Sequence, residues 1–125
     1  MAATVSTSTQ ATPIGTDLYT IKETTTVSDD VAVDTTSGSL LAVEIDNTSN
    51  SSAAYLLLYD VAAGSVTVGT TDETFIFMAP ASSRITYACP GGATYGTALT
   101  AAISSAPHSA TGPGVAVTAY VLVST

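Results

Sequence analysis

Only a few residues of this sequence have side chains that commonly act in catalysis. The chain holds one cysteine, Cys89, and one histidine, His108. Nucleophilic catalysis requires a nucleophile beside a base, with a third group that orients the base, and nothing in the sequence pairs Cys89 with His108. We interpret Cys89 as a small buried residue at the end of a strand, and His108, in a segment with prolines and glycines, as a solvated loop side chain. The sequence therefore predicts that this protein is not an enzyme.

The acidic residues are the other candidates for chemistry, because carboxylates bind metals and transfer protons. Seven of the ten form three small clusters, namely Asp29, Asp30 and Asp34, then Glu44 and Asp46, then Asp72 and Glu73. The first cluster lacks the spacing of an EF-hand calcium loop, and one histidine and one cysteine are too few for a structural zinc site. Gly91-Gly92 and residues 112–114 lack the spacing of a phosphate-binding loop. We predict no metal and no cofactor, and expect the acids to be solvated or to accept hydrogen bonds from backbone N–H groups.

The charge of the chain excludes two classes of partner. The formal net charge is −8, and Lys22 and Arg84 are its only lysine and arginine. A nucleic-acid-binding surface needs several such cations to displace counterions from phosphates, and an anionic membrane surface attracts the same residues. We therefore expect neither nucleic acid nor membrane as a partner. The negative charge suits a face turned toward water or a basic protein partner.

Short β-strands must position these residues. The chain has 15 Ser and 23 Thr, and threonine and valine favour pleated sheets. Strict alternation marks segment 40–46, where Leu41, Val43 and Ile45 share one face. A turn is expected at residues 89–92, and no segment competes as an amphipathic helix. The pattern predicts about eight short strands with turn signals between them, drawn from residues 17–27, 31–34, 40–46, 54–61, 66–68, 75–78, 84–88, 98–103 and 115–123.

This pattern predicts an all-β fold, an antiparallel two-sheet β-sandwich that is jelly-roll-like or Ig-like. The length of 125 residues fits one domain. We expect residues 1–15, which have no periodicity, to form an extended N-terminal arm, and residues 16–125 to form the sandwich. The segment 54–61 is apolar on both faces, which predicts a central strand with a second covered surface. That second surface is a candidate interface between subunits.

Two features bear on association and on the site of synthesis. Charged residues make up 10% of the chain, where about a quarter is usual. A monomer with so few charges is poorly defended against association, so we expect a homo-oligomer. A lone cysteine forms no intrachain disulfide and suggests synthesis in a reducing cytosol, and residues 1–10 show no secretory signal.

The second half of the chain holds a series of motifs at turns and strand edges. They are YLLLYD at residues 55–60, VTVGTTD at 66–72, FIFMAPA at 75–81, PGG at 90–92, YGTAL at 95–99 and VAVTAY at 115–120. Together these motifs, which span a little over half of the chain, resemble a family of small virion proteins of tailed bacteriophages. The family often has proline where this chain has Asp72-Glu73. The resemblance implies a β-sandwich virion component, such as a capsid decoration (cement) protein or a subunit of a fibre or tail.

On this resemblance, we expect a capsid decoration protein that lies on the outer capsid surface of the virion and stabilises the shell, and that is made in the host cytoplasm. Its partner would be the major capsid protein, with a trimer as the favoured homo-oligomer. Many copies stabilise a shell even when each contact is modest. The predicted assembly contacts lie in the N-terminal arm and on the spare face of segment 54–61, at Thr4, Val5, Ile14, Tyr55, Leu57 and Tyr59.

Two alternatives remain open at this point. One is another virion part, such as a tail, fibre or head–tail subunit. The other is a carbohydrate- or receptor-binding β module in which Tyr19, Tyr87 and Tyr95 stack on the ligand. For these tyrosines, ordinary packing in the core and at its rim is the preferred interpretation.

Overall fold

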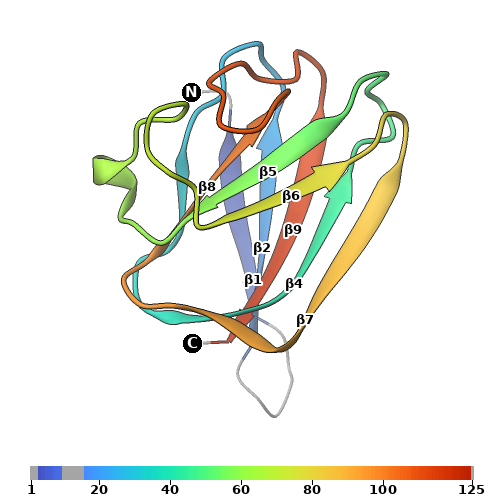
Figure 1. The fold of residues 1–125 in the computed structure, drawn as a ribbon. Helices are drawn as coiled ribbons and strands as arrows, with labels where there is room; N and C mark the ends of the chain where they lie inside the picture. The colour runs from blue at the N-terminus through green and yellow to red at the C-terminus, as the bar shows by residue number, and fades with distance from the viewer. Residues whose placement is uncertain (1–2, 10–15, 125) are drawn as a thin grey trace.

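Two antiparallel β-sheets pack face to face in the computed structural model (Figure 1). The structure describes residues 3–9 and 16–124, with side chains described for residues 3–6 and 17–124. Over these ranges the chain forms nine strands and the short 3-10 helix η1 (Ala63–Ser65), and no helix is long and apolar enough to cross a membrane. The strands are β1 (Thr4–Thr9), β2 (Thr16–Glu23), β3 (Val31–Asp34), β4 (Gly38–Asp46), β5 (Ala54–Tyr59), β6 (Phe75–Ala79), β7 (Arg84–Tyr95), β8 (Leu99–Ser104) and β9 (Val117–Ser124).

The order of the strands is that of a jelly roll. One sheet has the order β1-β2-β9-β4-β7 and the other has the order β3-β8-β5-β6. The antiparallel pairs β2–β9, β3–β8, β4–β7 and β5–β6 make the chain from β2 to β9 one long hairpin whose paired halves alternate between the two sheets. The predicted antiparallel sandwich is therefore confirmed. Of the two forms that we expected, this strand order matches the jelly roll and differs from the Ig order.

The core lies between the sheets because apolar residues alternate with polar ones along the strands. In β9, all four odd-numbered residues from Val117 to Val123 are fully buried, and the residues between them are half-buried. Ile21, Ala119 and Ile45 lie opposite one another on three adjacent strands and point into this core. Each fully buried valine, leucine or isoleucine stabilises the fold by about 1.5–3 kcal/mol relative to an exposed one.

Two expectations about local structure fail at one irregularity between β4 and β7. The register shifts between Leu40 and Ala42, so Leu40, rather than Leu41, is buried with the rest of the core face of β4. On β7, the shift falls at residues 89–92, where we expected a turn. Gly91 and Gly92 have φ angles of 79° and 80°, which residues with a Cβ rarely adopt. The two glycines therefore form a bulge, and the strand continues to Tyr95.

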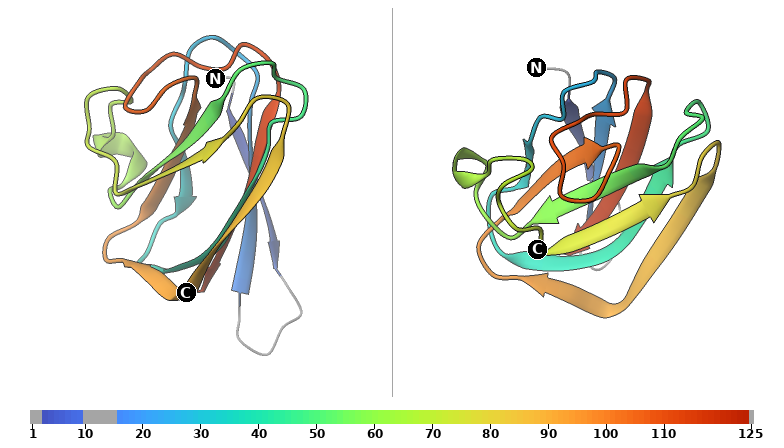
Figure 2. Two further views of the ribbon diagram at one scale, coloured as in Figure 1. Left: turned by 45° about the vertical axis from the view of Figure 1, so that its right-hand side comes forward. Right: turned by 45° about the horizontal axis from the view of Figure 1, so that its top comes forward.

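The spare face of β5 is covered by the chain itself. The connection between β5 and β6, residues 60–74, folds back beside the smaller sheet (Figure 2). Leu57 and Tyr59 of β5 and Ala102 of β8 are fully buried and pack with Val66 of this connection. The predicted strand at residues 66–68 is therefore wrong, because this segment covers a sheet instead of joining one. The second covered surface that we predicted for segment 54–61 is present, but it is buried within the chain.

Part of the predicted N-terminal arm is a strand of the sandwich. β1 forms one edge of the five-stranded sheet and pairs with β2 along its whole length, so that Val5 lies opposite Ile21. Residues 1–2 and 10–15 lie outside the described residues. The division into an arm and a domain at residue 15 stays a prediction.

Candidate protein-binding face

The five-stranded sheet turns one face away from the core, and we call this surface the outer face. Its side chains form three rows that cross strands β2, β9, β4 and β7 in that order. The first row is apolar, the second is mixed and the third carries the charges. They consist of Leu18, Leu122, Ala42 and Ala88, then of Thr20, Tyr120, Glu44 and Thr86, and then of Lys22, Thr118, Asp46 and Arg84.

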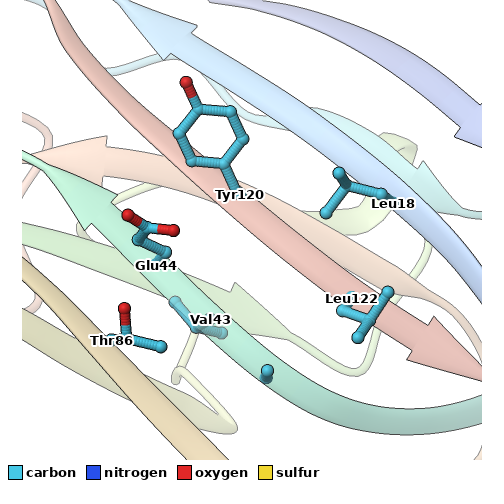
Figure 3. A pocket seen from close by; sticks show the side chains of 7 residues that line it. Leu18, Val43, Glu44, Thr86, Tyr120 and Leu122 are labelled. Atoms are coloured by element: carbon cyan, nitrogen blue, oxygen red, sulfur yellow. The ribbon is translucent and has the colours of Figure 1, made fainter.

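A shallow hollow of about 170 Å³ lies between the first two rows (Figure 3). Leu18 of β2 and Leu122 of β9 form one side of it beside the ring of Tyr120, while Glu44 and Thr86 lie on the other side. Leu18 and Leu122 are directly opposite each other in the β2–β9 register, where cross-strand side chains are in contact. The surface of the hollow is almost entirely carbon. It is therefore an apolar depression on an otherwise polar surface.

Ion pairs join Arg84 to one acid of the second row and one acid of the third row. The Arg84 guanidinium donates from Nε to Glu44 and lies 3.5 Å from Asp46 through Nη1. Its Cζ atom is 5.7 Å from the centroid of the Tyr120 ring, within the range of a cation–π contact. Hydrogen bonds from Thr48, together with the charge of Arg84, hold the pKa of Asp46 below its usual range. The lowered pKa keeps Asp46 ionised at neutral pH as a partner of Arg84.

Asp60, away from the outer face, serves a structural purpose. Its carboxylate accepts hydrogen bonds from the backbone N–H groups of Gly96 (2.8 Å), Thr97 (2.8 Å) and Ala98 (3.3 Å). These hydrogen bonds hold the pKa of Asp60 below its usual range. The carboxylate ties the end of β5 to the turn between β7 and β8, as we expected for acids that satisfy backbone donors.

Two further acids are buried and accept hydrogen bonds, one from backbone N–H groups and the other from a side-chain hydroxyl. Glu23 is fully buried and accepts from the backbone N–H groups of Thr24 and Asp29. Asp34 accepts a buried hydrogen bond of 2.7 Å from the hydroxyl of Tyr95. Within the part of the chain that the structure describes, no three residues of His, Cys, Asp or Glu are placed to hold a metal ion.

The structure keeps Cys89 and His108 in separate environments. Cys89 lies within β7, not at its end, and packs against the main hydrophobic core. His108 lies on the surface with its side chain 47% exposed, and its Nδ1 atom is 2.9 Å from Glu73. The hydrogen bond and the charge of Glu73 raise the pKa of His108. The His108–Glu73 pair therefore joins two loops, the connection 105–116 and the connection 60–74.

The predicted assembly contacts are not a single surface. Leu57 and Tyr59 are fully buried by the chain's own connection 60–74, so the prediction is wrong for both of them. Tyr55 is partly buried beside them, and Thr4 and Val5 are exposed at the edge strand β1. Ile14 lies outside the described residues.

The tyrosines that we considered for ligand stacking do not form a binding surface either. Tyr95 is fully buried. Tyr19 packs against the core cluster, and Tyr87 contacts the ring of Phe77 at a centroid distance of 5.2 Å. Packing was the preferred interpretation for all three, and the structure agrees with it.

Sequence reasoning missed the outer face. Tyr120 was placed only in a strand that closes the domain, and Leu18 and Leu122 lie on strands that are far apart in the sequence. The signal available was weak: Tyr120 and Leu122 are apolar residues at the polar positions of an alternating strand. They meet Leu18 only because the jelly roll pairs β2 with β9.

Comparisons with known proteins give no family for this chain. No family model matches it, and no curated protein matches it. The match among solved structures is to the Cupin_2 domain of an XRE family transcriptional regulator from Enterobacter cloacae, with 10% sequence identity, 100% of this chain and 98% of that chain covered, and a TM-score of 0.41. A match this weak says nothing about what this chain does.

The match nevertheless falls on a domain of a transcriptional regulator and not on a virion protein. No comparison supports the expected role as a capsid decoration protein or the alternatives offered beside it, and we do not propose them. The resemblance to virion proteins, the major capsid protein as a partner and the location on a virion stay predictions that no comparison tests.

Proposed function

We propose that this protein is a non-catalytic protein-binding module and that it binds through the outer face of its five-stranded sheet. One observation carries the proposal, namely the apolar hollow between Leu18, Leu122 and Tyr120. These three side chains are half-buried and leave a continuous apolar surface on the sheet face, and apolar patches on a surface often mark interaction sites. Tyrosine and arginine, which meet at Tyr120 and Arg84, are the residues that most often carry binding energy in protein interfaces.

The size and chemistry of the hollow favour a protein over a small ligand. At about 170 Å³ it is well below the range of roughly 300–1,000 Å³ that is usual for small-molecule sites. It is large enough for one apolar side chain that projects from a partner. A sugar or a cofactor also needs several polar groups that fix its orientation, and Glu44 and Thr86 are the polar residues that line the hollow.

The groups that catalysis would use are occupied by structural interactions. His108 is paired with Glu73, Asp60 binds three backbone N–H groups and Cys89 packs against the core. Each of these contacts contributes to folding, and none brings a base to a nucleophile as catalysis requires. These occupied groups support a non-catalytic role.

Small probes test this proposal directly. We would titrate the ¹³C-methyl-labelled protein with N-acetyl-leucine amide and N-acetyl-tryptophan amide, which mimic protein side chains, and separately with methyl glucoside. The expected result is that the two amides shift the methyl signals of Leu18 and Leu122, because these methyl groups line the hollow. The signals of Ile76 and Met78, which are exposed on the other sheet, serve as an internal control.

Two results would contradict the proposal. Shifts at Leu18 and Leu122 with methyl glucoside but not with the amides would make the hollow a sugar site. Amide-induced shifts at Ile76 and Met78 alone would move the binding surface to the other sheet. Thr86→Glu, which places a charge at the rim of the hollow, is expected to abolish the shifts at Leu18 and Leu122 without unfolding the protein, because Thr86 is exposed.

A further inference from the structure

The distribution of charge indicates which protein suits the outer face. The chain has two strong cations and ten acids. Both cations, Lys22 and Arg84, lie on the outer face, with only Glu44 and Asp46 among the acids. Two positive and two negative charges cancel, so the formal charge of this face is zero and the whole net charge of −8 belongs to the rest of the molecule.

A second copy of this chain is the partner that such a surface fits. Two copies repel each other wherever their acidic surfaces meet, because like charges brought into contact are destabilising. On the outer face this repulsion is absent, and Lys22, Asp46 and Arg84 offer both signs for pairing. We propose that the outer face binds the outer face of a second copy in a twofold-symmetric pair, an inference that rests on the proposed function and names its partner.

A second exposed apolar patch is less suited to self-association. Ile76 (45% exposed) and Met78 (39% exposed) lie on the edge strand β6. The connection 60–74, which leads into this strand, carries Asp72 and Glu73. Asp72 is exposed, so two copies that met through this patch would bring negative charge near the contact, whereas Glu73 is paired with His108 and its side chain is only 5% exposed. The apolar side chains of the outer face are less exposed than Ile76 and Met78, but this face carries no net charge that would repel a second copy.

The area of the outer face is sufficient for a weak, specific pair. Five strands about 4.8 Å apart and three rows of side chains about 6.7 Å apart give a footprint of roughly 500 Å² on each copy. Two copies would then bury on the order of 1,000 Å² in total, which is the lower limit for specific interfaces. A pair of this size is expected to form in the micromolar range or above. Because both copies use the same surface, the assembly closes at two, in contrast to the trimer that we expected from the sequence.

Sedimentation velocity over a concentration series tests the inference with three proteins. The wild-type chain is expected to change from monomer to dimer as its concentration rises from ~1 to ~500 µM. Thr86→Glu adds one negative charge to the outer face, and Ile76→Glu adds the same charge to the β6 patch. Both positions are exposed, so both variants should fold. We expect Thr86→Glu to weaken dimerisation about tenfold or more and Ile76→Glu to leave it unchanged.

Salt provides an additional readout. The wild-type dimer should depend little on salt, because the charges of its interface cancel, whereas ~1 M NaCl should partly restore the dimer of Thr86→Glu by screening the added charge. A trimer, a dimer that only Ile76→Glu disrupts, or a monomer at every concentration would overturn the inference. If the monomer still binds the leucine and tryptophan probes in its hollow, the proposed function stands and only the identity of the partner fails. If the probes do not bind, the proposed function fails as well.

Discussion

The hydroxyl of Tyr95 and the carboxylate of Asp34 meet inside the sandwich, 61 positions apart in the sequence. Burial and the neighbouring carboxylate both raise the pKa of Tyr95, so the phenol remains a hydrogen-bond donor at every ordinary pH. In the sequence, Asp34 stood out only as a member of an acidic cluster, and Tyr95 was considered only for stacking or packing. Residue types alone do not reveal such a pair, because its geometry depends on how β3 and β7 are brought together.

Removal of the Tyr95 hydroxyl is expected to destabilise the fold. Tyr95→Phe leaves the ring in place but removes the donor to a carboxylate that is only 7% exposed, at an expected cost of about 1–3 kcal/mol. Urea denaturation measures this difference in the free energy of unfolding. Tyr120→Phe, the same chemical change on the outer face, should cost much less, and equal losses in the two variants would refute the structural importance of the buried bond.

The stability that the His108–Glu73 pair contributes should depend on pH. Because Glu73 raises the pKa of His108, the pair contributes its full stability below the ordinary histidine pKa of about 6.5 and loses it as the pH rises through the higher pKa of the folded protein. NMR titration of the His108 ring should give a pKa above the ordinary value in the wild-type protein. In Glu73→Gln it should fall toward that value, and an unchanged pKa would show that Glu73 is not the partner in solution.

At the scale of the elements, most strands follow from alternation and turn chemistry. The segments 31–34, 54–61 and 75–78 were predicted within two residues of β3, β5 and β6. The failures have physical causes. Val66 and Val68 favour a strand locally but cover β5 instead, and the two glycines after Pro90 signal a turn but form a bulge. Local sequence sets only the propensity of a segment. The strand that a segment meets decides whether two glycines form a turn or a bulge, and whether an apolar segment joins a sheet or packs over one.

Asp60 holds two of these elements together, so its removal should affect stability in a pH-dependent manner. Because its pKa in the folded protein is lowered, its contribution is fully present above the ordinary aspartate pKa of about 3.9 and is lost as the pH falls through the lower folded pKa. Asp60→Asn is expected to lose about 1–2 kcal/mol at pH 7, and less below pH ~3. Denaturation at both pH values measures this difference.

Asp72→Asn removes the same charge from the exposed surface of the connection 60–74 and serves as the matched control. It should leave the stability at pH 7 nearly unchanged. A loss in Asp60→Asn that is equal at both pH values would show that the three backbone N–H groups are not what stabilises the carboxylate.

At the scale of the whole molecule, charge segregation is the feature with most bearing on function. The sequence showed few charges and predicted association, but it did not show where association takes place. The sequence placed the contacts in the N-terminal arm and on the spare face of β5, and the chain itself covers that face of β5. The neutral outer face becomes visible only when the jelly roll places Lys22, Asp46 and Arg84 in one row across the sheet. Association was expected from composition and stays a prediction, whereas the surface that we propose for it depends on the topology.

Methyl signals recorded during dilution would test whether the outer face is the surface through which this protein binds. We would record the ¹³C-methyl spectrum of the wild-type protein from ~500 to ~5 µM, a range that brackets the expected micromolar affinity. Concentration-dependent shifts are expected for Leu18 and Leu122 on the outer face, while Ile76 and Met78 on β6 stay constant. Shifts confined to Ile76 and Met78 would contradict this expectation.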